Sequence, residues 1–282
     1  MPELWGLAEI IAKWALYLGL MGAVGTIFNT WVFKFEDTRS LTIQFANLGL
    51  VASLLVFFLK GASLTGDARG MIDPEMLGLL WSTANGPALI HRVMGLLLVV
   101  MGLYLGPVGR WISLAGGLLG LWSFAHVGHV SGLESIALSA VLMLHLIAVA
   151  FWVGILIPLK RLASNPLMLV RTGEVAAKFG RIASIFVPVL VLAGGVLGYF
   201  LLGSFTLLVT TGYGQVLIVK LLLVGALLSL AAINKLGFVP EVNAGRVDAA
   251  DRLARSISLE WICGVGIFGA TAVLTSSVTL PM

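Results

Sequence analysis

The chain has 282 residues, of which 59% are hydrophobic and only 11% are charged, and its mean hydropathy is +1.06. Because soluble domains carry about 25% charged residues, this composition excludes an ordinary soluble domain and is typical of an integral membrane protein. The formal net charge of +4 needs no nucleic-acid partner, since loop lysines and arginines that orient membrane helices account for it. The single cysteine, Cys263, excludes an internal disulfide and a metal site of paired cysteines.

Apolar runs long enough to cross a bilayer follow one another along the chain. A crossing helix needs about 20 mostly apolar residues, whereas barrel strands would alternate in polarity. We therefore predict an all-α, polytopic membrane helix bundle with about eight transmembrane helices, forming one membrane domain over residues 1–282. The expected spans are approximately 4–33, 40–60, 84–106, 110–130, 133–158, 180–204, 212–236 and 254–278.

The segment 62–87 differs from its neighbours because it mixes charges and glycines with Trp81. We expect an extramembrane loop there, with a short interfacial helix near 74–82. Lysines and arginines gather in the loops 159–181 and 235–255. Since basic loops remain cytoplasmic, both termini and the 62–87 loop are predicted to face outward. The N-terminal sequence has no basic region before its apolar run, so we do not expect a cleavable signal peptide.

All four histidines fall within the apolar stretches. At about 1.5 Å per helical residue, His129 lies near the outer end of the fourth span, and His126 lies one turn deeper on the same face. His91 has a similar depth of roughly 8–12 Å, and His145 lies about 16–18 Å deep on the fifth span. The rings could simply pack and donate to helix carbonyls. Ionisable groups inside a membrane mark function by default, however, and four in one leaflet favour a site.

Neutral imidazole is the commonest metal ligand in proteins. Imidazole combined with thioether suits copper, whereas zinc more usually recruits cysteine or carboxylate. His145 is too deep to share one metal with His129 when bonds are near 2 Å, so a descending series fits better than a single site. The predicted metal ligands are His126, His129, His145 and His91. Met94, Glu9 and Met143 are candidates for additional ligands or for groups that orient the imidazoles.

A different chemistry uses the same rings. Histidines at matched depth on two helices can be axial ligands of haem b, and His91 with His126 would be such a pair. The protein would then transfer electrons, and a cupric reductase is one form of this alternative. Two-haem membrane cytochromes usually place ligands in both leaflets, whereas none falls in the inner half here.

Two acidic residues inside the spans have local partners. Lys13 follows Glu9 by four residues, so the two side chains can pair along the first helix. Glu260 lies close to Arg255 and Ser256, and we expect a helix-end ion pair there. The alternative for Glu260 is an exit ligand for the metal.

Six segments from residue 125 onward carry a family resemblance. They are AHVGHVSG at 125–132, HLIAVAFWVGILIPL at 145–159, FGRIASIFVPVLVLAGGVLGY at 179–199, YGQVLIVKLLLV at 213–224, AAINK at 231–235 and RSISLE at 255–260. In this order they resemble the CopD family of bacterial inner-membrane copper resistance and copper transport proteins, with a CopD-like core at roughly 120–280.

The resemblance implies copper handling at the bacterial inner membrane, most simply import from the periplasm to the cytoplasm. It also implies a separate periplasmic copper-binding partner of the CopC type, and it makes the outward side the periplasmic side. An assembly subunit that delivers copper to an enzyme is another alternative. No P-loop or other nucleotide motif is present, so we expect no ATP hydrolysis. No Ser/His/Asp or paired-carboxylate arrangement indicates a hydrolase, and we expect no enzymatic activity, although a redox activity would follow if haem is bound. Lipid is the other expected partner, and the oligomeric state stays open.

Overall fold

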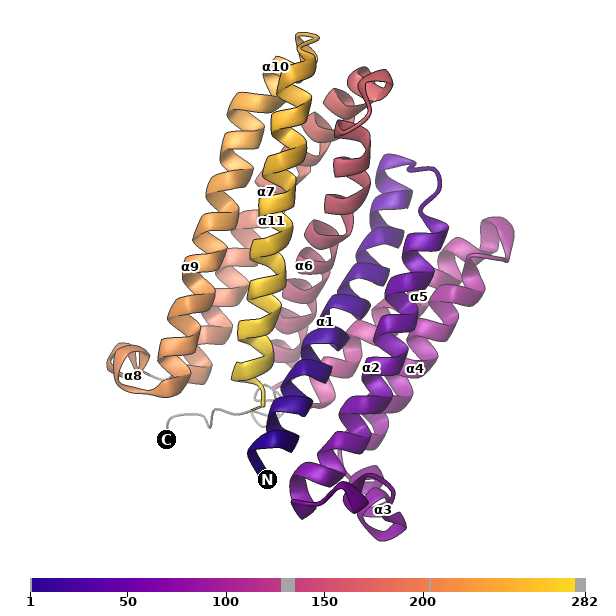
Figure 1. Ribbon diagram of the computed structural model, residues 1–282, viewed down its shortest axis with the longest axis vertical. Helices are drawn as coiled ribbons and strands as arrows, with labels where there is room; N and C mark the ends of the chain where they lie inside the picture. Colours follow the sequence, from indigo (N-terminus) through magenta and orange to yellow (C-terminus); the bar gives the residue numbers. More distant parts are fainter. Residues whose placement is uncertain (1, 128–134, 203, 277–282) are drawn as a thin grey trace.

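The computed structural model of the chain describes residues 2–127, 135–202 and 204–276 (Figure 1). Within these ranges every regular element is a helix, which confirms the all-α prediction. The elements of the first half are α1 (Pro2–Phe33), α2 (Arg39–Thr65), the 3-10 turn η1 (Ala68–Met71), α3 (Pro74–Ser82), α4 (Asn85–Gly102) and α5 (Gly106–His126).

The second half begins with the long antiparallel helices α6 and α7. Its elements are α6 (Ile136–Ala163), the 3-10 turn η3 (Pro166–Met168), α7 (Leu169–Leu202), α8 (Phe205–Thr210), α9 (Gly212–Ile233), the π-helical turn η4 (Asn234–Phe238), α10 (Val239–Asn243) and α11 (Val247–Leu274).

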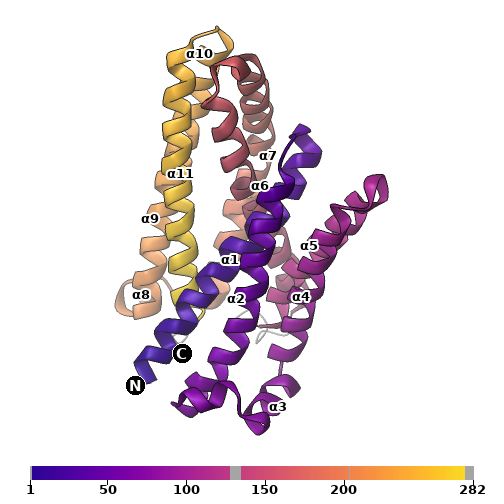
Figure 2. The ribbon, with the colours of Figure 1, turned by 45° about the vertical axis from the view of Figure 1, so that its right-hand side comes forward.

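The long helices run up and down the bundle, so their connections gather at two ends (Figure 1). We call one the α3 end, because it holds α3 and α8 together with the start of α1 and the end of α11. The other is the basic end, which holds α10 and the turns 34–38, 103–105 and 164–168. Figure 2 shows α4 and α5 at one flank and α9 at the opposite flank.

Among the described residues, seven helices are long and apolar enough to cross a membrane, one fewer than the eight spans expected. The missing one is α5, whose five glycines, two tryptophans and Arg110 dilute its apolar character. It nevertheless runs antiparallel to α4, and glycines let the two backbones touch. A Cβ added at Gly95 would lie 2.6 Å from the carbonyl oxygen of Gly116 and from the amide nitrogen of Gly120. Such small-residue contacts are the usual means of close helix packing in membranes.

Several boundaries differ from the expected spans. The fourth span was expected to reach residue 130, but α5 ends at His126 because Val127 is extended, with φ −129° and ψ 149°. The sixth was expected from 180, yet α7 already begins at Leu169, so much of the basic 159–181 loop is helix. The short helix near 74–82 is confirmed as α3. Asp73 caps it by accepting from the Glu75 amide at 3.0 Å, and Pro74 occupies its first turn.

The two largest hydrophobic clusters of the described residues fill most of the bundle, and α6 contributes to both. Ala150 and Val153 belong to the cluster around α1 and α2, whereas Trp152 and Ile155 belong to the cluster around α7 and α11. The crossing of α1 and α6 is so close that a Cβ on Gly25 would meet the Ala150 carbonyl oxygen. Gly154 of α6 makes the same close approach possible from the other side, because its added Cβ would lie 2.5 Å from the Gly25 Cα. α6 thus joins the two halves.

The two basic segments of the sequence, 159–181 and 235–255, lie at one end of the bundle, as the charge pattern predicted. Lys178 donates to the Val32 carbonyl at 2.6 Å, and Arg171 donates to the Phe33 carbonyl at 2.5 Å. These cations satisfy carbonyls that the last turn of α1 leaves without helical partners and lie at the negative end of its dipole.

Candidate functional site

The imidazoles of His91 and His126 meet on neighbouring helices. Their ring centroids are 4.7 Å apart and the ring planes differ by 20°, so the rings are stacked. His91 lies six residues into α4, about 9 Å from its start, and His126 is the last residue of α5. The prediction that these two rings have matched depth is confirmed. The glycine contacts between α4 and α5 are what allow the rings to come together.

Each ring of this pair keeps a nitrogen available. The His91 Nδ1 lies 2.7 Å from the Pro87 carbonyl oxygen, which can only accept, so Nδ1 carries the proton. Nε2 then keeps its lone pair, and no described residue forms a hydrogen bond with it. The His126 Nε2 is buried and has no hydrogen-bond partner among the described residues. Buried polar atoms without partners are uncommon, and a backbone carbonyl that fixes the tautomer is the usual support of a metal-ligating imidazole.

A buried cation adjoins the pair, and the sequence analysis missed it. Arg92 is 6% exposed, and its Nε donates to the Ser123 hydroxyl of α5 at 3.1 Å. Its guanidinium lies 5.2 Å from the centre of the Phe124 ring. In the part of the chain that the structure describes, no carboxylate lies within ion-pair distance of Arg92. Arg92 could have been recognised from the sequence, because an arginine inside an apolar span is uncommon and marks function by default.

His145 faces a different helix from the pair. A Cβ added to Gly194 of α7 would lie 3.4 Å from His145 Cε1, so this ring packs against α7. Its Nδ1 is buried without a hydrogen-bond partner in the described ranges. Met143 packs against the first hydrophobic cluster. Among the described residues no contact links His145 to the stacked rings, so the descending series stays a prediction.

The remaining predicted ligands do not complete a cluster. Met94 is 51% exposed, and His129 lies outside the described residues. Among the described residues, no group of three or more His, Cys, Asp or Glu could hold a metal ion. The structure therefore brings together two of the four predicted histidines.

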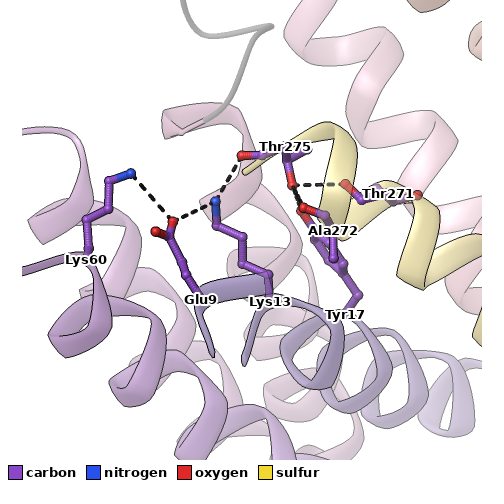
Figure 3. Close-up of polar contacts among 7 residues, drawn as sticks. All are labelled: Glu9, Lys13, Tyr17, Lys60, Thr271, Ala272 and Thr275. Carbon is purple, nitrogen blue, oxygen red and sulfur yellow. Dashed lines mark hydrogen bonds and ion pairs between the residues drawn. The ribbon is translucent and has the colours of Figure 1, made fainter. Parts of the chain in front are cut away.

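Glu9 belongs to a charge network at the α3 end (Figure 3). Its carboxylate is 3% exposed and pairs with Lys13 Nζ at 3.0 Å and Lys60 Nζ at 3.5 Å. Lys13 also donates to the Thr275 carbonyl at 2.9 Å, and the Thr275 hydroxyl shares a hydrogen bond with Tyr17. The predicted pairing of Glu9 with Lys13 is confirmed. Because two lysines already engage the carboxylate, this arrangement favours a role in joining α1, α2 and α11.

The expected ion pair between Glu260 and Arg255 is wrong. Residues five apart on a helix do not share a face, and here Arg255 is exposed whereas Glu260 is 3% exposed. Glu260 instead accepts from Trp152 Nε1 of α6 at 3.1 Å and from Asn234 Nδ2 of η4 at 2.5 Å. All three residues lie in segments that carry the family resemblance, yet only the fold shows that they meet.

Comparison with known proteins places the histidine pair and, of the Glu260 cluster, Asn234 and Glu260 inside recognised family ranges. The family model described as "Copper resistance protein D-like, N-terminal domain" matches residues 1–137, which include the His91–His126 pair. The model described as "Copper resistance protein D" matches residues 173–274, which include Asn234 and Glu260. The N-terminal match extends the family into a region that the six resembling segments do not reach.

The chain is also similar to the copper transport protein CutJ of Bacillus subtilis (strain 168). The two are 27% identical over 284 residues, covering 93% of this chain and 51% of the relative. The chain thus spans about half the length of this curated relative. No solved structure matches it. With matched ranges on both sides of α6 and a multi-pass helical fold, the chain belongs to the CopD copper resistance protein family.

Proposed function

We propose that this protein carries copper across the bacterial inner membrane, from the periplasm to the cytoplasm, and that the His91–His126 pair is its entry site. The observation that carries the proposal is the stacked pair, because it offers two imidazole nitrogens without hydrogen-bond partners among the described residues. Imidazole is a suitable ligand for copper in a site with no thiolate. Copper is the cargo here, so the site must release it as well as bind it.

Arg92 is suited to the release step. A buried guanidinium beside the rings repels a bound cation, and the repulsion is stronger inside a membrane than in water. Conduction requires binding that is favourable enough for entry but weak enough for exit. The pair of imidazoles supplies the first property, and Arg92 supplies the second. In this proposal His129 and His145 remain further ligands predicted from the sequence.

The direction of transport rests on the proposed orientation. The family membership and the alternating helices support eight crossings in which α5 returns beside α4, with both termini periplasmic. Basic segments favour the cytoplasmic side, so the basic end would face the cytoplasm and the α3 end the periplasm. The expected donor is a periplasmic copper-binding protein of the CopC type. We propose no enzymatic reaction for the chain.

The haem alternative fits the pair less well. Two axial ligands approach a haem iron from opposite faces of the macrocycle. Rings stacked 4.7 Å apart leave no room for a macrocycle between them. A spectrum decides between these chemistries directly.

The test uses the full chain purified in detergent. Two quantities are measured for the wild type and for the double variant His91→Ala/His126→Ala. One is the content of copper, iron and zinc, and the other is the absorption spectrum. We expect bound copper without a Soret band in the wild type and loss of that copper in the double variant. Gln215→Ala, an exposed polar position at the start of α9, is the matched control and should retain copper. Iron with a Soret band, or unchanged copper in the double variant, would refute the proposed site.

A further inference from the structure

A closed polar cluster lies deep in the second half of the bundle, away from the histidine pair. Glu260 is 13 residues into α11, about 20 Å from the start of that helix at the basic end. It borders a cavity of about 250 Å³ between α6, α7, η4 and α11. Most of the lining is apolar; the polar residues in it are Trp152, Ser184, Asn234, Lys235 and Glu260.

The carboxylate is held by neutral donors. One oxygen accepts from the Trp152 indole and the other from the Asn234 amide, and in the described chain no lysine or arginine lies within ion-pair distance of either. Lys235 also lines the cavity, but its ammonium donates to the Ser184 hydroxyl. A buried carboxyl without a counter-charge marks an ion or proton pathway by default.

Asn234 can serve either form of the carboxyl. A side-chain amide has a donating NH₂ and an accepting oxygen. With Nδ2 toward Glu260 it donates to a carboxylate, as found here. After a rotation of the amide, Oδ1 would accept from the O–H of a carboxylic acid. Asn234 is 7% exposed, and its Oδ1 is buried without a hydrogen-bond partner among the described residues. The acceptor that a protonated Glu260 needs is therefore present and unused.

The backbone at this point has an unusual geometry. Asn234 begins the π-helical turn η4 within an otherwise continuous helix from α9 into α10. Such π-bulges occur frequently at functional sites. Ser256, one turn before Glu260 on α11, adds another buried hydroxyl without a partner in the described ranges. The polar groups around the carboxyl thus have unused hydrogen-bonding capacity.

We propose that Glu260, with Asn234 and Trp152, is a proton-binding site whose protonation is coupled to the movement of the cargo. The carboxylate takes one proton from water and becomes a neutral acid, and it returns that proton when the charge is restored. Two chemical features favour a proton over a metal ion here. Both carboxylate oxygens already accept hydrogen bonds, and a lysine lines the same cavity. The coupling, but not the proton site itself, rests on the proposed copper transport.

The proton site is tested without copper, by infrared difference spectra of the full chain between low and high pH. We expect a carboxylic-acid C=O band that is absent from the isosteric variant Glu260→Gln. Asn234→Leu keeps the carboxyl but removes its acceptor, so the band should move to the higher frequency of a weakly hydrogen-bonded acid. A band unchanged in both variants would overturn the proton site.

The coupling is tested by copper uptake into proteoliposomes over a pH series. We expect Glu260→Gln to slow uptake at least about tenfold, which corresponds to about 1.4 kcal/mol, and to abolish its dependence on pH. Equilibrium copper content at the histidine pair reports separately on the proposed function. Uptake with the same rate and pH dependence in wild type and Glu260→Gln would overturn the coupling. A titrating Glu260 band in a chain that takes up no copper would refute the proposed function and leave the proton site intact.

Discussion

The histidine pair and the Glu260 cluster show two opposite ways of placing polar groups in one membrane bundle. The pair lies in a glycine-packed helix pair at the flank. Each ring keeps one nitrogen without a partner among the described residues, and a buried arginine lies beside the rings. The cluster lies between four segments, and both oxygens of its acid are occupied. The first arrangement suits exchange of an external ligand. The second arrangement suits protonation and deprotonation of the carboxyl group, which change its charge without the binding or release of a metal ion.

The difference follows from the chemistry of the two groups. A neutral imidazole can be half-buried at modest cost, and it keeps a lone pair for a metal. A buried carboxylate is far more costly and persists only with hydrogen-bond donors. His145 lies seven residues before Trp152 on α6, which is two turns on the same face and about 10 Å. α6 therefore connects His145 with the Glu260 cluster along one helix face.

The largest effect should come from separating α4 from α5. Gly116→Leu places a side chain where a Cβ would already lie 2.6 Å from the Gly95 carbonyl oxygen. We expect a loss of stability of about 1–3 kcal/mol and loss of copper binding, while the Glu260 infrared band remains. Gly225→Leu on α9, where an added Cβ meets nothing within 4 Å, is the control. Thermal unfolding in detergent and copper content measure both effects, and normal copper content in Gly116→Leu would contradict the proposed geometry.

Removing one ring of the pair should weaken copper binding strongly. His126→Ala deletes the imidazole whose Nε2 is unpartnered, and we expect the copper dissociation constant to rise at least about 10–100-fold. Competition titration with a copper chelator provides the measurement. If His126→Ala and Gln215→Ala bind copper equally well, the pair is not the entry site.

The indole of Trp152 should matter for the inner cluster alone. Trp152→Phe removes one donor to the buried carboxylate, which we expect to cost about 1.5–3 kcal/mol because the acceptor is charged. Denaturant unfolding measures the loss, and copper content at the pair provides a separate readout. Trp111→Phe, at a 63% exposed position, should have little effect. Equal stability of the two variants would show that the indole hydrogen bond contributes nothing.

Arg92 should act on copper affinity in the opposite direction from the histidines. Arg92→Gln removes the positive charge while keeping a donor for the Ser123 hydroxyl. We expect copper to bind about five- to tenfold more tightly and to leave more slowly, since roughly 1 kcal/mol of repulsion is removed. Chelator competition and stopped-flow release measure these changes. Weaker binding in Arg92→Gln would mean that the guanidinium supports the site instead of destabilising the cargo.

The smallest effect should come from the outer lysine of the Glu9 network. Lys60 is 36% exposed and its Nζ is 3.5 Å from Glu9, so Lys60→Met should cost no more than about 1 kcal/mol. Lys13→Met should cost more, because Lys13 is less exposed and also holds the Thr275 carbonyl. Unfolding of the two variants in detergent compares them, and a larger loss for Lys60→Met would reverse this interpretation of Figure 3.

The sequence predicted the features that depend only on the order and spacing of residues along the chain. Hydropathy located the spans, the mixture of charges and glycines with Trp81 located α3, and the four-residue spacing predicted the pair of Glu9 and Lys13. The rise per residue gave His91 and His126 their matched depth. Helix ends were less predictable, because α7 extends its amphipathic start beyond the apolar run and α5 stops at an extended Val127.

What the sequence determined by itself is a polytopic helical membrane protein with basic segments at one end and histidines near the other. Only the tertiary structure decided how each helix is rotated about its axis, and therefore which of its faces contacts each neighbouring helix. In the fold, His145 contacts α7 at Gly194, and Arg92 is buried with its Nε bonded to Ser123. Three residues from separate elements also meet there, namely Trp152, Asn234 and Glu260. The physical reason is that helix rotation depends on close packing at contacts such as Gly25 with Gly154 and Gly95 with Gly116. Hydropathy sets depth in the membrane but leaves that rotation undetermined.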